Sequence, residues 1–140
     1  VFAHEVVMEG TVRTLDESCR DIAEKRVREV AEGTAMVHGA TVEINYRRGY
    51  PVTVNHEDET TYAADVAKSV AGQIEDNVNP IMPAEDFSYM LLERPGAYIF
   101  LGNGDTAVCH HPEYNFDDEA LPFGASWLSG MVEARAPANS

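Results

Sequence analysis

The stretch EVVMEGTVRT, residues 5–14, alternates apolar and polar side chains as a half-buried β-strand does. Val6, Met8 and Val12 share one face, and polar residues occupy most of the other. Because successive side chains of a strand point to opposite faces, this pattern predicts a strand with one face turned to a core.

The residues that follow complete a predicted β-α-β unit. Asp16 is placed to cap a helix over residues 17–37, where alanine and valine recur at helical spacing and Gly39 supplies the stop. TVEINY, residues 41–46, then alternates again as a second strand. Residues 1–50 are too few to bury both faces of a sheet, so we expect half of a small α/β sandwich.

The character of the sequence changes at RRGYPVTVN, residues 47–55, where glycine and proline interrupt the periodicity. We place a domain boundary in this stretch. Residues 1–50 are then predicted to form one domain, and residues 51–140 another.

The second part predicts three helices and one strand. An amphipathic helix over 57–71 could be capped by Asn55, and a shorter helix covers about 84–92. AYIFL, residues 97–101, is a continuous apolar run, typical of a strand covered on both faces. The last helix, over about 119–134, carries an apolar stripe with a four-residue spacing, formed by Phe123, Trp127 and Met131.

Composition excludes several classes of partner. The formal net charge of −14 repels nucleic-acid phosphates and anionic membrane surfaces, and no apolar stretch reaches the roughly 20 residues of a membrane span. Cys19 and Cys109 lack the spacing of a zinc site or a disulfide framework, so we expect a reducing, cytoplasmic compartment. The chain starts without methionine in a strand-like run, so we expect it to be a piece of a longer polypeptide.

The candidate site residues each admit a structural explanation. His110 and His111 in CHHPEYNFDDEAL, residues 109–121, could include a metal ligand or only form a turn before a helix. Adjacent Glu85 and Asp86 suit a helix start, where negative charge is favoured without any function. Arg13 could bind a substrate carboxylate in a bidentate way or pair with a neighbouring acid. Taken one by one, these residues do not decide a function.

The order of five blocks is more specific than any one of them. The blocks are GTVRT (10–14), YRRGYPVTVN (46–55), AEDFSYML (84–91), PGAYIFLGNGD (95–105) and HHPEYNFDDEALPFGA (110–125). Together they closely resemble the C-terminal part of the dinuclear-metal amidohydrolases and metallopeptidases. That family includes hippurate hydrolase, N-acyl-amino-acid deacylases and the indole-acetyl-amino-acid hydrolases.

The resemblance implies a role for each candidate residue. It makes His110 a ligand of one of two divalent ions, such as zinc or manganese, and His111 a variable neighbour. It places Glu85 and Asp86 near the metal site without binding the ions, and Arg13 and Asn55 toward the substrate. The general-base glutamate and the other ligands belong to an N-terminal half, so the resemblance places no catalytic residue in this segment.

The fold and function implied by the resemblance are those of an amidohydrolase segment. The α/β fold would consist of the second half of a β-α-β lid domain, which forms homodimers, and the C-terminal part of a metallopeptidase-like catalytic domain. The implied reaction is hydrolysis of the amide bond of an N-acyl amino acid, such as hippurate, to a carboxylic acid and an amino acid. The alternative is a catalytically inactive fragment that serves in dimerisation or binding.

Overall fold

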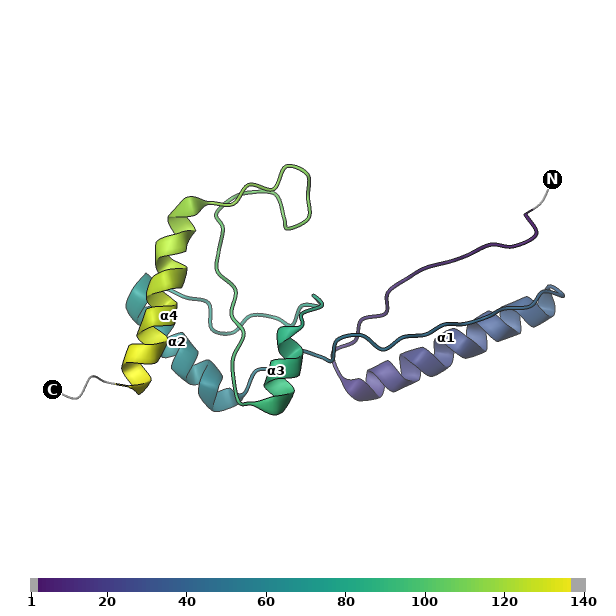
Figure 1. Cartoon of the computed structure of the whole chain (residues 1–140), viewed down its shortest axis with the longest axis horizontal. Helices are drawn as coiled ribbons and strands as arrows, with labels where there is room; N and C mark the ends of the chain where they lie inside the picture. The colour runs from purple at the N-terminus through teal and green to yellow at the C-terminus, as the bar shows by residue number, and fades with distance from the viewer. Residues whose placement is uncertain (1–2, 137–140) are drawn as a thin grey trace. The chain divides into compact units, whose positions relative to one another are not determined.

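The computed structural model describes residues 3–136, and the regular secondary structure of these residues is helical (Figure 1). Its elements are α1 (Glu17–Val37), α2 (Glu57–Ala71), α3 (Phe87–Glu93), the short 3₁₀ helix η1 (Asp118–Ala120) and α4 (Leu121–Arg135).

The chain divides into two compact units. One comprises the residues up to Thr53 together with Pro80–Tyr89, and the other comprises Val54–Asn79 together with the residues from Met90 onward. The assignment of residues 1–50 and 51–140 to two domains of a larger protein stays a prediction. None of the helices among residues 3–136 has both the length and the apolar character needed to cross a membrane.

The predicted strands are not formed within residues 3–136, so the α/β class and the lid domain are not confirmed. Segments 5–14, 41–46 and 97–101 lack regular secondary structure. A strand requires a neighbouring strand to pair with its N–H and C=O groups, and the described residues provide none. The alternation itself is visible in one segment, where Ile44 and Tyr46 are half-buried and the residues beside them are exposed.

Helix α1 begins and ends where its sequence predicts. The Asp16 carboxylate accepts hydrogen bonds from the Ser18 hydroxyl at 2.6 Å and from the Cys19 N–H at 2.8 Å. These bonds, that of Ser18 first, lower the pKa of Asp16 to about 2 from its ordinary 3.8. The capping interaction therefore contributes fully above pH 3.8 and is lost as the pH falls through about 2. At the other end Gly39 has a φ of +64°, in the left-handed region that glycine tolerates.

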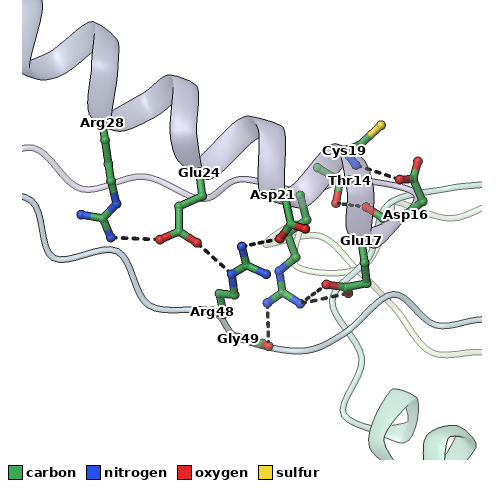
Figure 2. Close-up of polar contacts among 10 residues, drawn as sticks. Thr14, Asp16, Glu17, Cys19, Asp21, Glu24, Arg28, Arg48 and Gly49 are labelled. Atoms are coloured by element: carbon green, nitrogen blue, oxygen red, sulfur yellow. Dashed lines mark hydrogen bonds and ion pairs between the residues drawn. The ribbon is translucent and has the colours of Figure 1, made fainter.

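Salt bridges attach the segment after α1 to the first half of that helix (Figure 2). Arg48 donates to Glu24 at 2.8 Å and to Asp21 at 2.6 Å, and Arg28 donates to the second oxygen of Glu24 at 3.0 Å. The Glu24 carboxylate thus lies between two guanidinium groups, which lower its pKa, Arg48 most strongly. Because these charges form a connected network, they restrain the extended segment more effectively than an isolated surface pair would.

The second unit is built on the packing of α2 against α4. Ala63 and Val66 of α2 are buried, and the Trp127 indole N–H donates to the Ala63 carbonyl at 3.0 Å. The Tyr62 hydroxyl donates to the carbonyl of Met131 at 2.5 Å. Trp127 therefore faces α2, as its spacing predicts, and Met131 is half-buried.

Phe123, which the sequence places on the same stripe as Trp127 and Met131, is 48% exposed, so that part of the prediction is wrong within the described residues. Gly124, the next residue, faces inward instead, and a Cβ there would lie 3.2 Å from Leu101.

We expect Gly130→Ala to destabilise the protein. The added Cβ would lie 2.9 Å from Val66 Cγ1, closer than real Cβ contacts, so the Val66 side chain or the two helices would have to shift. Overpacking of this kind costs about 1–3 kcal/mol. Alanine also gains roughly 0.5–1 kcal/mol over glycine in a helix, so we expect a net decrease in the free energy of unfolding that is smaller than the overpacking cost. Denaturant unfolding of the purified protein measures the change.

Gly33→Ala in α1 is the matched control. A Cβ at Gly33 meets no atom within 4 Å, so the variant gains helix propensity without a clash. Its free energy of unfolding should rise by roughly 0.5–1 kcal/mol. If both variants are stabilised, the close approach of α2 and α4 at Gly130 is wrong.

Candidate functional site

The two histidines lie on a loop that leaves the apolar run 97–101 and returns to the start of α4 (Figure 1). The side chain of Asn103 joins the two ends of this loop. Its Nδ2 donates to the Asn115 carbonyl at 2.8 Å, and its Oδ1 accepts from the Asp117 N–H at 2.7 Å. Asp117 in turn accepts from the Glu119 N–H at 3.0 Å and so caps η1. The loop is therefore closed where the next helix begins.

Two consecutive turns form the tip of the loop. The His111 N–H donates to the Val108 carbonyl at 3.0 Å, and the Tyr114 N–H donates to the His111 carbonyl at 3.0 Å. Pro112 follows His111 at the second position of the second turn, where its fixed φ is favourable. Cys109 and His110 are the central residues of the first turn.

The backbone of His110 is in an unusual conformation. Its φ is +72°, and it is the one non-glycine residue with a positive φ among residues 3–136. A positive φ at the third position of a turn is typical of the type II turn, which usually has glycine there. A non-glycine residue in this region costs roughly 1–2 kcal/mol, and such strain is often found at functional sites.

The two imidazole rings have different surroundings. The Nδ1 atom of His111 accepts the Glu113 N–H at 3.1 Å, so this ring helps to build the second turn. His110 is exposed, and its ring forms no hydrogen bond or ion pair with any of residues 3–136. Of the two, His110 is the ring available to an external ligand.

The loop fits a metal ion as the source of one ligand. A neutral, exposed imidazole is the commonest protein ligand for transition metals. No group of three or more histidine, cysteine, aspartate or glutamate side chains that could hold an ion exists within residues 3–136. A complete site would therefore need ligands from beyond the described part of the chain.

Glu85 and Asp86 lie where α3 begins. The Glu85 carboxylate accepts the Phe87 N–H at 3.2 Å, and its backbone carbonyl accepts the Ser88 hydroxyl at 2.6 Å. The hydrogen bond with Glu85, and then the charge of Glu85, raise the pKa of Asp86. This geometry agrees with helix capping, and the predicted role of the pair near a metal site stays a prediction.

Asn55 does not cap α2, contrary to the expectation from sequence. The N-cap is His56, which makes no capping bond through its side chain. The amide of Asn55 is instead used by Tyr98, whose carbonyl accepts from Nδ2 at 2.9 Å and whose N–H donates to Oδ1 at 2.7 Å. The competing contact with Tyr98 lies 43 positions along the chain, so local sequence gives no sign of it.

The predicted site residues are divided between the two units. Arg13, Glu85 and Asp86 belong to the first unit, whereas Asn55 and His110 belong to the second. Arg13 is exposed on the segment before α1. Asn103 is not among the residues predicted from the sequence, although an asparagine between two glycines shortly before paired histidines was a usable signal.

Comparison with known proteins gives a family match over almost the whole chain. The family model of "Peptidase family M20/M25/M40" matches residues 2–134. No solved structure was found that matches the chain.

Three curated relatives illustrate the similarity. The Bacillus subtilis protein YhaA, named as an amidohydrolase, is 36% identical over 94% of this chain and 35% of its own length. The N-acetyldiaminopimelate deacetylase of Streptococcus sanguinis is 33% identical over 95% of this chain and 36% of its own length. The hippurate hydrolase of Campylobacter jejuni is 32% identical over 87% of this chain and 32% of its own length. The chain thus spans about a third of the length of these relatives.

Alanine is usually more stabilising than glycine, but the left-handed backbone of His110 predicts the opposite order at this position. His110→Gly should be more stable than His110→Ala by about 1 kcal/mol, because only glycine adopts this φ without strain. Denaturant unfolding of the metal-free protein measures the difference without a contribution from metal binding.

Cys109, the preceding residue, provides the control, because its φ is not positive. There the ordinary order should hold, with Cys109→Ala more stable than Cys109→Gly by roughly 0.4–1 kcal/mol. The same order at both positions would contradict the strained turn.

Proposed function

The chain belongs to peptidase family M20/M25/M40, and from this we propose that the whole protein is a metal-dependent amidohydrolase acting on N-acyl amino acids. The reaction would cleave the amide bond and release a carboxylic acid and an amino acid. The observation that carries the proposal is the family match over residues 2–134, which includes the loop of His110.

The choice of substrate class rests on two relatives. One is a hippurate hydrolase and the other is an N-acetyldiaminopimelate deacetylase. Both substrate names describe an acyl group joined by an amide bond to the nitrogen of an amino acid. We propose hippurate-like compounds as substrates because they combine this amide with a free carboxylate that a guanidinium group such as Arg13 can bind.

Two divalent ions, zinc, manganese or similar, would supply a nucleophile at neutral pH and polarise the amide carbonyl. His110 would hold one of these ions, because its ring is exposed and unengaged. Glu85 and Asp86 would lie near the ions and orient the site. Asn55 would face the substrate, since the contacts with Tyr98 use only one donor and one acceptor of its amide and leave one of each.

The assembly and location of the protein are also proposals. We propose an α/β protein whose lid domain, including residues 1–50, forms a homodimer, with no nucleic-acid or membrane partner. Both cysteines are free and exposed, which suits the reducing cytoplasm that we propose as its location.

The isolated chain of 140 residues should be inactive. It offers one imidazole of the ligand set, and its described residues contain no cluster of donors for an ion. As an isolated segment it would act at most in dimerisation or binding, which is the alternative function considered from the sequence.

The direct test of the function is hydrolysis by the whole protein. Purified protein should release glycine from hippurate or diaminopimelate from N-acetyldiaminopimelate, and a chelator should abolish the activity until divalent ions are restored. Activity that survives complete removal of metal, or failure to cleave any N-acyl amino acid, would refute the proposal.

Substitution of the paired histidines separates their roles. In the whole protein, His110→Ala should remove one ion and lower turnover by orders of magnitude, because the reacting water loses an activating metal. His111→Ser should keep both ions and lose little activity, since the Nδ1 of His111 serves the Glu113 N–H. Elemental mass spectrometry and hippurate hydrolysis on both variants measure these effects.

A purely structural role of both histidines makes a different prediction. If both histidines only stiffen the turn before α4, the two variants should show similar small losses of stability and full metal content. Equal metal content in the two variants would end the assignment of His110 as a ligand.

A further inference from the structure

The side chain of Asn103 binds two backbone groups of the loop that carries His110. Its side chain is half-buried and uses Nδ2 to bind the Asn115 carbonyl and Oδ1 to bind the Asp117 N–H. The two bonded groups belong to residues that are two positions apart. A residue of a neighbouring parallel strand would bond to the same two groups, and the Asn103 amide takes its place. Both bonds are short, at 2.8 Å and 2.7 Å, and they fix the returning end of the loop against its outgoing end.

Asn103 closes the loop on the side opposite its tip. Between the two ends, Asn115 has a weaker contact with Thr106, whose hydroxyl oxygen accepts the Asn115 N–H at 3.4 Å. No other side-chain hydrogen bond between the outgoing residues 102–107 and the returning residues 114–117 is found in the described part of the chain. The separation of the loop ends therefore depends chiefly on one amide group.

The conformation of His110 requires such support. A residue with a φ of +72° and a side chain larger than hydrogen retains that conformation only when its surroundings over-determine it. The hydrogen bond from His111 to Val108 closes the turn locally, and Asn103 holds the segments on which this turn stands. Loosening the base of the loop would let the His110 turn relax and move its imidazole.

We propose that Asn103 is a positioning residue for His110, acting on the metal ligand through the loop backbone and not through direct contact with an ion or substrate. The inference rests on the proposed function, in which His110 binds one of two divalent ions. A side chain that orients a ligand typically changes metal affinity by about 10–100-fold when it is removed. Because Asn103 acts through the backbone, we expect the lower end of this range.

The chain contains a matched control for this proposal. Asn55 binds the N–H and carbonyl of Tyr98 with the same two amide atoms, at 2.7 Å and 2.9 Å, in the same unit. Asn55→Ala therefore removes an equivalent pair of hydrogen bonds without touching the His110 loop. Comparison of the two variants separates the effect of lost stability from the effect on the metal ligand.

The experiment titrates Co²⁺ into the metal-free whole protein and follows the visible absorption of the bound ion, which reports its ligands and their geometry. Asn103→Ala should bind one of the two ions about tenfold more weakly and with an altered spectrum. Because the titration contains no substrate, the substrate contact proposed for Asn55 does not enter it, and Asn55→Ala should keep the wild-type Co²⁺ affinity and spectrum even if its unfolding midpoint falls as much. If Asn103→Ala does not fold, Asn103→Asp replaces it, since it keeps the acceptor for the Asp117 N–H but loses the donor to the Asn115 carbonyl, and it should show a shift of the same kind.

Each other outcome overturns a definite statement. Wild-type Co²⁺ affinity and spectrum in the Asn103 variants would overturn the positioning role and leave the proposed function intact. Equal losses of Co²⁺ affinity in the Asn103 and Asn55 variants would show that Asn103 contributes only to the stability of the fold. This result would also overturn its positioning role. Failure of the wild-type protein to bind Co²⁺ would overturn the proposed function, and the inference with it.

Discussion

The extended segments of the second unit are held by side chains that bond to backbone groups, because the described residues contain no neighbouring strands to do so. Buried or half-buried N–H and C=O groups must find partners. Asn55 provides them for Tyr98, and His56 pairs with Gly96 through its N–H at 3.0 Å and its Nδ1 at 3.2 Å. Asn103 repeats the arrangement at the other end of the same run.

Asn103 connects the loop of the two histidines to the start of α4. Its side chain closes the loop and accepts the N–H of Asp117, the cap of η1, and α4 begins directly after η1. The position of His110 is thus set by hydrogen-bonded groups that lead to α4, whereas Asn55 fixes the apolar run at Tyr98, before the loop begins.

The helices could be predicted from the sequence because their causes are local. The Asp16 cap, the stop at Gly39 and the apolar spacing of α2 all lie within a few residues of the elements that they define. Strands depend on partners elsewhere in the sequence. The alternation at 5–14 therefore predicts an apolar face, but it does not identify the segment that would pair with the strand or cover that face. For the same reason the role of Asn55 was misjudged, and the partners of Asn103 could not be seen. His110 was identified by family resemblance alone, since nothing local to the sequence distinguishes it from His111.

The structure gives the adjacent histidines complementary roles that explain why one of them can be strained. The positive φ of His110 costs roughly 1–2 kcal/mol, which one hydrogen bond of about 0.5–1.5 kcal/mol does not reliably offset. The loop provides several such bonds, from Asn103 at its base, from the turn at Val108 and from the His111 ring to Glu113. Together these bonds can offset the strain, so the conformation can persist before any ion binds. The imidazole of His111 is used to build the turn, and that of His110 is left free by it.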